Sequence, residues 1–191
     1  MAERHRILIV TGSRAFDCDA IPRAWARHQI VQAFARVRPA LVAHGAAPGW
    51  DRYTDELALW LGVPRAVFDL SGPVRVLRDG HAVALPVAQG GARLPHMLLP
   101  GGGGRLLKDA ARYRYSGPLP RNEALMRWAA DRAAEGHDVE VVSAIAPWSS
   151  SGGTRRALDH AVAFDLRVTV VDVPTSAWPA EDPVHEGQHG A

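Results

Sequence analysis

Cysteine is nearly absent from this chain of 191 residues, in which Cys18 is the only one. A single cysteine excludes a disulfide within the chain and a zinc site built from cysteine ligands. No apolar run approaches the roughly 18 residues that a membrane-spanning helix requires. The first residues, MAERHRILIV, lack the apolar core and cleavage site of a signal peptide. We therefore expect a cytoplasmic protein with no membrane partner.

A strong charge of either sign is also missing, because the formal net charge is only +2 and no block of like charge occurs. Such a balance permits an anionic ligand without requiring a nucleic acid. Lys108 is the only lysine, so arginine carries nearly all of the positive charge, and its planar guanidinium suits phosphate. A bias in the base composition of the genome would raise the arginine content equally, so each arginine has to be judged by its position.

The chain also lacks three familiar nucleotide and hydrolase motifs. It contains no G-x-G-x-x-G after the first apolar run, no G-x-x-x-x-G-K-[ST] and no G-x-S-x-G. These absences disfavour ordinary dinucleotide binding and exclude a P-loop NTPase and a nucleophile elbow. A triad of Ser13, His44 and Asp51 is disfavoured, because a histidine at a strand end is usually part of a polar rim. His185 and His189 lie in a polar tail, so we predict neither a metal nor a cofactor.

Apolar runs typical of strands alternate with stretches of helical periodicity along most of the chain. This alternation predicts an α/β fold: a Rossmann-like, doubly wound, mainly parallel sheet of about five to six strands with helices on both faces. The expected strands are 6–10, 40–45, 64–70, 138–146 and 167–173, and the expected helices are 20–37, 49–62, 120–136 and 152–166.

The regular pattern is interrupted between residues 71 and 115, which are rich in Gly, Pro and Arg. We interpret 71–115 as an insertion, a hairpin around Asp79-Gly80 followed by a mobile loop, within a single domain of residues 1–173. Residues 174–191 have no periodicity and are expected to form a flexible tail. In the helix expected at 49–62, periodicity places four apolar residues on one side: Tyr53, Leu57, Trp60 and Leu61.

Four polar segments lie where the predicted sheet would present one edge. TGSR (11–14) ends the first strand, HGAAPGWD (44–51) ends the second, SGPLPRN (116–122) begins a helix, and PWSSSGGT (147–154) joins a strand to a helix. Right-handed crossovers bring the carboxyl ends of parallel strands to one edge, where ligands bind at the point of reversed strand order. Each segment alone is what an ordinary turn or helix start contains, but together they favour a nucleotide-like ligand.

The residue types in these segments suit a phosphate and a sugar. Gly12 allows close approach, Arg14 can pair with phosphate, and SSSGGT presents N–H groups at a helix N-terminus. Asp51 either accepts from ribose hydroxyls or caps its own helix. The predicted ligand-binding residues are Gly12, Ser13, Arg14, His44, Gly45, Trp50, Asp51, Arg121, Asn122, Ser151, Gly152, Gly153 and Thr154.

The order and spacing of these motifs resemble the SLOG superfamily, and most closely its YspA-type, cpYpsA-related group. The resemblance is carried by ILIVTGSRAF, LVAHGAAPGWDRYTDELALWLG, SGPLPRNEALM and SSGGTRRALDHA, and it covers roughly residues 5–70 and 116–173. It implies a Rossmann-like fold that binds nucleotides or nucleotide-derived molecules. More distant members include the lonely-guy phosphoribohydrolases, which cleave the N-glycosidic bond of nucleoside monophosphates, and the Smf/DprA proteins, which bind single-stranded DNA.

Departures from the family pattern bear on the expected activity. Ala46 and Trp50 replace a Gly and an Ala, and Trp50 would either stack on a base or pack against the insertion. Lonely-guy hydrolases carry a Glu three residues after the Thr of the phosphate loop, where this chain has Ala157. The resemblance therefore implies a nucleotide-binding sensor or module more than an enzyme.

The alternative is an N-glycosidic enzyme, a phosphoribohydrolase or a transferase, which would need a carboxylate beside the anomeric carbon. Its candidate catalytic residues are Asp51, Glu123 and Asp159. Binding of single-stranded DNA is least favoured, because a net charge of +2 is small for that role. Related folds commonly pair, so a homodimer is a further expectation by analogy.

Overall fold

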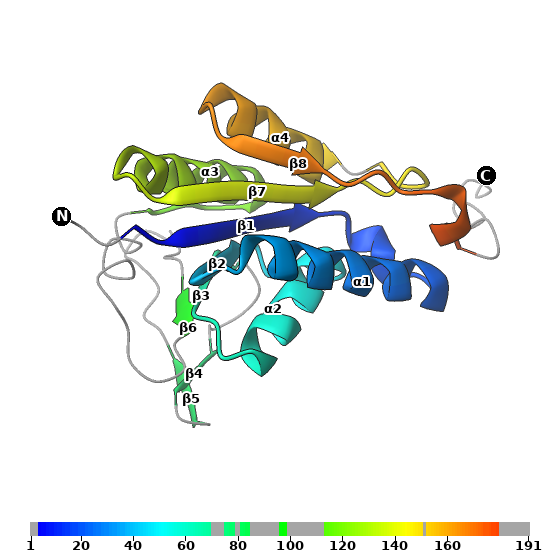
Figure 1. Cartoon of the computed structure of the whole chain (residues 1–191), viewed down its shortest axis with the longest axis horizontal. Helices are drawn as coiled ribbons and strands as arrows, with labels where there is room; N and C mark the ends of the chain where they lie inside the picture. The colour runs from blue at the N-terminus through cyan, green and yellow to red at the C-terminus, as the bar shows by residue number, and fades with distance from the viewer. Residues whose placement is uncertain are drawn as a thin grey trace, which may run out of the picture.

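The computed structural model describes residues 4–69, 75–78, 81–84, 96–98, 113–150 and 152–179, and Figure 1 shows its elements along the chain. In chain order they are β1 (Arg6–Gly12), η1 (Arg14–Asp17), α1 (Ala20–Val37), β2 (Leu41–His44), α2 (Trp50–Trp60), β3 (Arg65–Val67), β4 (Arg75–Arg78), β5 (His81–Ala84), β6 (His96–Leu98), α3 (Pro118–Ala134), β7 (Asp138–Ala144), α4 (Gly152–Ala163), β8 (Arg167–Val170) and η3 (Thr175–Ala177), where η marks a 3-10 helix.

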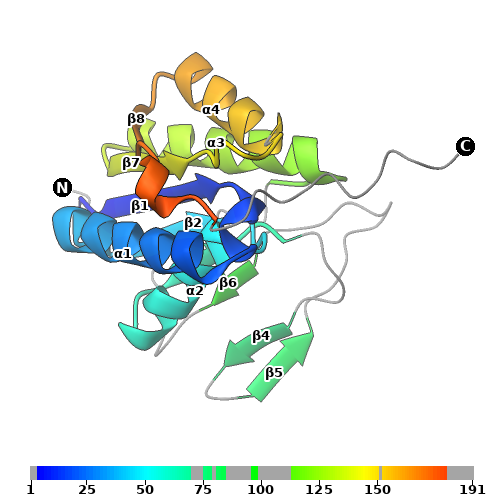
Figure 2. The ribbon, with the colours of Figure 1, turned by 90° about the vertical axis from the view of Figure 1, so that its right-hand side faces the viewer.

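The main sheet has the strand order β6-β3-β2-β1-β7-β8. Five neighbouring strands, from β3 to β8, run parallel, and β6 pairs antiparallel with β3. Helices α3 and α4 cover one face and α1 and α2 the other, as the two views agree (Figures 1 and 2). The predicted Rossmann-like, doubly wound fold is confirmed. From β1 the chain builds outward to β2 and β3 on one side and to β7 and β8 on the other, so strand order reverses between β1 and β7.

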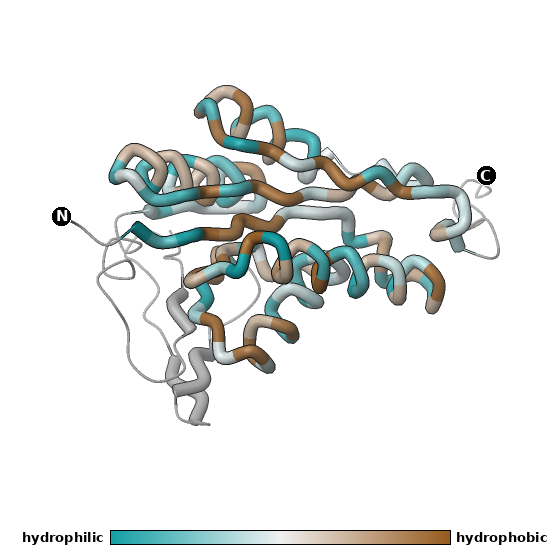
Figure 3. The backbone as a smooth tube through the Cα atoms, viewed as in Figure 1, coloured by the Kyte–Doolittle hydropathy of each residue, from teal (hydrophilic) through white to brown (hydrophobic). Residues whose placement is uncertain are grey.

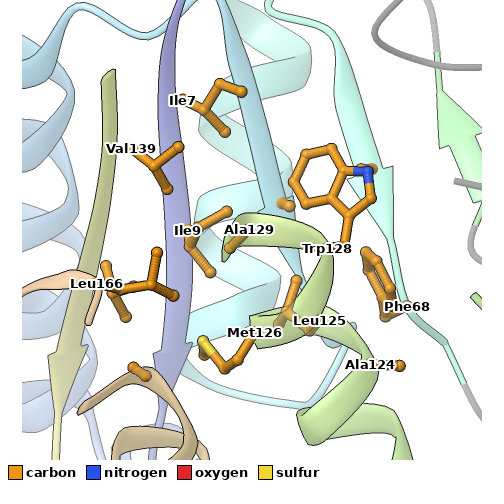
Figure 4. Close-up of a cluster of buried hydrophobic side chains, with 14 of the residues drawn as sticks. Ile7, Ile9, Phe68, Ala124, Leu125, Met126, Trp128, Ala129, Val139 and Leu166 are labelled. Atoms are coloured by element: carbon orange, nitrogen blue, oxygen red, sulfur yellow. The ribbon is translucent and has the colours of Figure 1, made fainter. Parts of the chain in front are cut away.

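The first strand is buried on both of its faces, which explains its unbroken apolar run. Ile7 and Ile9 pack beneath α3 and α4, while Leu8 and Val10 pack beneath α1 and α2, and all four are at most 1% exposed. Figure 4 shows the first of these clusters, in which the β1 side chains meet Leu125, Met126 and Ala129 of α3. The hydropathy colouring in Figure 3 marks the same apolar stretch along β1. A continuous run is typical of a strand in a parallel sheet that is covered on both sides.

Helix α1 spans residues 20–37, as predicted, because both of its ends carry local signals. The Asp19 carboxylate accepts a hydrogen bond from the Ala20 N–H at the start, and Arg38 adopts a left-handed φ of 48° at the end. Helix α2 buries only the first part of the apolar side that was predicted. Tyr53 is buried and Leu57 packs against the core, whereas Trp60 is 80% exposed and Leu61 is 47% exposed. The remaining apolar contact comes from Trp50, Thr54 and Ala58, which are four residues apart. The small residues at 54 and 58 bring the helix close to the sheet.

The insertion contains both an expected and an unexpected strand pair. Strands β4 and β5 pair antiparallel in the register of a hairpin, as the alternating sequence predicts. Strand β6 was not predicted, and it extends the main sheet beyond β3. The Asp79-Gly80 turn, the predicted mobile loop apart from β6 and the last twelve residues of the predicted tail lie outside the described residues.

The part of the predicted tail that the structure describes, residues 174–179, contains η3. Within it Ala177 is buried, and the Trp178 ring lies 6.1 Å from that of Trp148. The first residues of this segment therefore pack on the domain. Within the described parts of the chain, no helix has both the length and the apolar character needed to cross a lipid bilayer.

The core beneath α3 generates a first prediction. Leu125 is 1% exposed in this cluster, so Leu125→Ala is expected to lower the free energy of unfolding by about 2–5 kcal/mol through lost burial and a residual cavity. Leu59→Ala serves as the control, because Leu59 is 52% exposed and its truncation is expected to cost less than about 0.5 kcal/mol. Urea denaturation of both variants measures the difference, and equal losses would contradict this packing of α3.

Candidate functional site

A cavity of about 380 Å³ opens at the carboxyl end of the sheet, where strand order reverses between β1 and β7. All four of the polar segments singled out in the sequence contribute to its wall. The described residues that line it are Thr11, Gly12, Ser13, Arg14, Ala47, Asp51, Pro118, Leu119, Arg121, Asn122, Ser149, Ser150, Gly152, Gly153 and Thr154. This is the position at which open α/β sheets bind their ligands.

The exit of β1 is shaped by a close contact with α2. A Cβ added to Gly12 would lie 2.4 Å from Cγ of Trp50, so only glycine fits above the indole. Beyond it, the Ser13 N–H donates to the Ala144 carbonyl at 3.0 Å, and the hydroxyls of Ser13 and Ser149 lie 3.2 Å apart. The loops that follow β1 and β7 are thereby joined across the reversal point.

Asp51, in the first turn of α2, is buried and holds the loop that follows β2. Its Oδ2 accepts from the N–H groups of Gly45 at 3.0 Å and Ala47 at 3.3 Å. Its Oδ1 is buried with no hydrogen-bond partner among the described residues, although Asp51 lines the cavity. Burial raises the pKa of Asp51, and the electrostatic interactions with His44 and with the charge of Arg121 oppose this rise only in part. The site thus contains a carboxylate with one oxygen left over for a donor.

Arg121 and Asn122 connect the start of α3 to two other loops. The Arg121 guanidinium donates from Nη1 to the Gly45 carbonyl at 2.5 Å and from Nε and Nη2 to Oδ1 of Asn122. The Asn122 amide then donates to the Gly153 carbonyl at 2.9 Å. A Cβ on Gly45 would lie 2.8 Å from Cζ of Arg121, so this approach needs glycine. Burial is the main cause that lowers the pKa of Arg121, and the charge of Asp51 works against it.

The cavity is rich in groups that attract anions. Gly152, Gly153 and Thr154 belong to the first turn of α4, where backbone N–H groups have no partner within the helix. Arg14 is exposed at the wall, and no described residue forms an ion pair or hydrogen bond with its guanidinium. Two guanidinium groups and a helix N-terminus therefore face a single carboxylate among the described lining residues.

Nine of the thirteen predicted ligand-binding residues line this cavity, and three of the others are placed elsewhere. Trp50 is completely buried against Phe16 and Trp25 behind Gly12, so it has no surface on which a base could stack. His44 and Gly45 lie behind the wall, where His44 contacts Asp55 and Gly45 contacts Arg121. Ser151 lies outside the described residues.

The three carboxylates considered for catalysis also separate in the structure. Asp51 lines the cavity, whereas Glu123 is turned outward and forms an ion pair of 2.7 Å with Arg127. Asp159 is exposed on α4, about one and a half turns beyond Thr154, the last lining residue of that helix. Glu123 follows Arg121 by two residues, a spacing that places the two on different sides of a helix.

The structure adds six lining residues that are absent from the predicted list: Thr11, Ala47, Pro118, Leu119, Ser149 and Ser150. Ser149 and Ser150 belong to the same serine run as Ser151. The sequence therefore predicted their segment as part of the site, but not these two positions. In the part of the chain that the structure describes, no group of three or more His, Cys, Asp or Glu side chains is arranged to hold a metal ion.

Known proteins give no independent guide to this site. The chain matches no family model, no curated protein and no solved structure. Its function must therefore be argued from the cavity itself.

The loop after β2 generates a second prediction. Ala46 has a φ of 55°, a left-handed conformation that costs a residue with a Cβ about 1–2 kcal/mol. Ala46→Gly relieves this strain in the folded protein, but glycine also raises the conformational entropy of the unfolded chain, which offsets part of the stabilisation. We expect a net increase in the free energy of unfolding of about 0.5–1 kcal/mol, or about 1–4 °C in Tm.

Ala47→Gly is the matched control, because Ala47 has no positive φ and should lose stability on the same change. Thermal unfolding of the two variants measures the contrast. A destabilised Ala46→Gly protein would contradict the described conformation of this loop.

The buried Asp51 generates a third prediction, in which pH is the variable. Its pKa is raised from 3.8 by burial, so the folded protein binds more protons than the unfolded chain as pH rises from 3.8 to the folded pKa. Stability is therefore lost over that window. Asp51→Asn keeps an oxygen for the two N–H groups and cannot titrate. The Tm of the variant relative to the unmodified protein should rise as pH is increased from 3.5 to 8, and a constant or falling difference would be the contrary result.

Proposed function

We propose that this protein binds a nucleotide or a nucleotide-derived small molecule in the cavity at the carboxyl end of the sheet, as a sensor or ligand-binding module. The single observation that carries the proposal is the composition of the cavity wall. Arg14, the buried Arg121 and the first turn of α4 surround a carboxylate oxygen of Asp51, and within the described residues neither the Arg14 guanidinium nor this oxygen has a partner.

Each half of such a ligand has a complementary group in the wall. A phosphate placed against α4 would accept from the N–H groups of Gly153 and Thr154 in its first turn and pair with Arg14, which forms charge-assisted hydrogen bonds. A ribose hydroxyl would donate to Oδ1 of Asp51 and supply the bond that this buried oxygen lacks. Pro118 and Leu119 offer an apolar surface at the same wall.

The resemblance to the YspA-type group of the SLOG superfamily supports the same proposal. The four segments on which it rests are those that supply the cavity wall. Location in the cytoplasm and pairing into a homodimer belong to this proposal as well, and both rest on analogy and on the composition of the chain.

A second candidate function is cleavage of an N-glycosidic bond, and the observation that favours it is again Asp51. A buried carboxylate with a raised pKa beside a ribose site could act on the anomeric carbon or on its leaving group. Incubation with AMP and CMP, followed by chromatography, separates the two functions. Release of free base would show an enzyme, and stabilisation of the protein without base release would show a binding module.

The role of Arg14 provides a fourth prediction. Loss of charge-assisted hydrogen bonds in Arg14→Ala is expected to weaken binding of a nucleoside monophosphate such as AMP by about 10–100-fold in Kd, which corresponds to about 1.5–3 kcal/mol. Isothermal titration calorimetry measures the affinity. The stability of the variant itself should change little, because no described residue depends on this guanidinium.

Arg127→Ala is the matched control, since Arg127 is also an exposed arginine, pairs with Glu123 and lies outside the cavity. It removes the same net charge and should leave the affinity for AMP within about twofold, because exposed distant charges are screened. If both variants bound AMP equally weakly, the loss would come from net charge alone, and binding in the cavity would be contradicted. An unmodified protein that binds no nucleotide would end the proposal.

A further inference from the structure

A second cavity, of about 520 Å³, lies on the β2–β3 side of the same two arginines. It shares Arg14, Ala47 and Arg121 with the first cavity. The two hollows are therefore neighbours that meet at a pair of guanidinium groups.

The walls of the two cavities differ in charge. Among the described residues, Asp51 is the one carboxylate that lines the first cavity, so the two shared arginines leave that wall with an excess of positive charge. The second cavity is lined by Asp17, Asp55 and Asp69 and, besides the shared arginines, by Arg52, so its formal charges cancel. Carboxylates accept hydrogen bonds from hydroxyl and amino groups. The second cavity thus suits an uncharged, donor-rich group.

Asp55 is the best-placed acceptor in this second wall. Its Oδ1 lies 3.2 Å from Nε2 of His44 and 3.2 Å from Nε of Arg65, and its side chain is still 34% exposed. Burial is the largest influence on the pKa of Asp55 and would raise it, but the hydrogen bond and electrostatic attraction of His44 and the charge of Arg65 outweigh burial and lower it. The carboxylate is therefore ionised at neutral pH, and its Oδ2 has no partner among the described residues.

The tautomer of His44 is set by its two neighbours. Nδ1 accepts from the Ala46 N–H at 3.1 Å, which leaves Nε2 to carry the proton that faces Asp55. The contact fixes the direction of the carboxylate, since His44 is 1% exposed and cannot move freely.

The junction between the cavities keeps free donors. Arg121 uses three of the five N–H bonds that a guanidinium offers, one to Gly45 and two to Asn122, so two remain. None of the five N–H bonds of the Arg14 guanidinium is used by a described residue. A phosphate group at the junction would be held from both sides.

We infer that the ligand spans both cavities, an inference that rests on the proposed function and specifies its ligand class. The ligand is a nucleotide whose phosphate, at Arg14 and Arg121, carries a second hydroxylated group, and this group occupies the second cavity and donates to Asp55. The chemistry is that of a phosphate-linked nucleotide conjugate with a polar, uncharged end. A nucleotide with a terminal phosphate would instead bring that charge to a wall with three carboxylates, in which the one further arginine, Arg52, is already paired with Asp17 and Glu56.

The test compares ADP-glucose, ADP and AMP as probes in isothermal titration calorimetry with the unmodified protein. ADP-glucose replaces the terminal charge of ADP with sugar hydroxyls, so we expect its Kd to be lower than that of ADP by about tenfold or more. Equal affinities for ADP and ADP-glucose, or tighter binding of ADP, would overturn the inference while leaving the proposed function in place. If none of the three probes binds, the proposed function fails and the inference fails with it.

Asp55→Asn adds a residue-level test, because it keeps the size of the side chain and removes its charge. The preference for ADP-glucose over ADP is expected to shrink to about threefold or less in this variant. Asp159→Asn is the matched control, since Asp159 is exposed on α4 outside both cavities, and it should retain the preference. An unchanged preference in Asp55→Asn would overturn the assignment of the second cavity. Should this variant fail to fold, the comparison in the unmodified protein decides alone.

Discussion

The buried guanidinium of Arg121 is the interaction on which the site depends. It donates to the carbonyl of Gly45, which lies 76 residues earlier in the chain, and to Asn122, which in turn holds Gly153 at the start of α4. Burial of a charge is costly unless its donors are satisfied and an opposite charge is near. Three hydrogen bonds and the charge of Asp51 provide this compensation. The same contacts that make the charge tolerable therefore fix the relative positions of three loops.

The sheet determines where this interaction can form. Five parallel strands direct their carboxyl ends to one edge, and the change of direction at β1 and β7 separates two sets of loops there. Gly12 rests on the indole of Trp50, while Ser13 bonds to the loop beyond β7 through Ala144 and Ser149. The scaffold is consequently rigid on the side of the cavity where the ligand phosphate is proposed to lie.

The fold could be predicted from the sequence because its signals are local and strong. Alternating apolar runs and helical periods predict where five strands lie along the chain and that they form a parallel sheet, and Asp19 and Arg38 mark the ends of α1. Strand β6 escaped prediction because a strand of three residues is defined by its partner β3 and by no period of its own. The predicted burial of Trp60 was wrong for a related reason. Periodicity shows which residues share a side of a helix, but the end of α2 extends past the surface that it could cover.

The segments that form the candidate site could also be predicted, since topology brings them together. The role of Trp50 could not, because the space left by Gly12 exists only once β1 and α2 have met. A site assembled in this way has no existence in any fragment of the chain: Ser13 and Ser149, which touch, are 136 residues apart. A ligand held there would bind only the completely folded protein. In a cell, proteases remove chains that open, so the occupied protein would outlive the empty one and the supply of ligand would set its abundance.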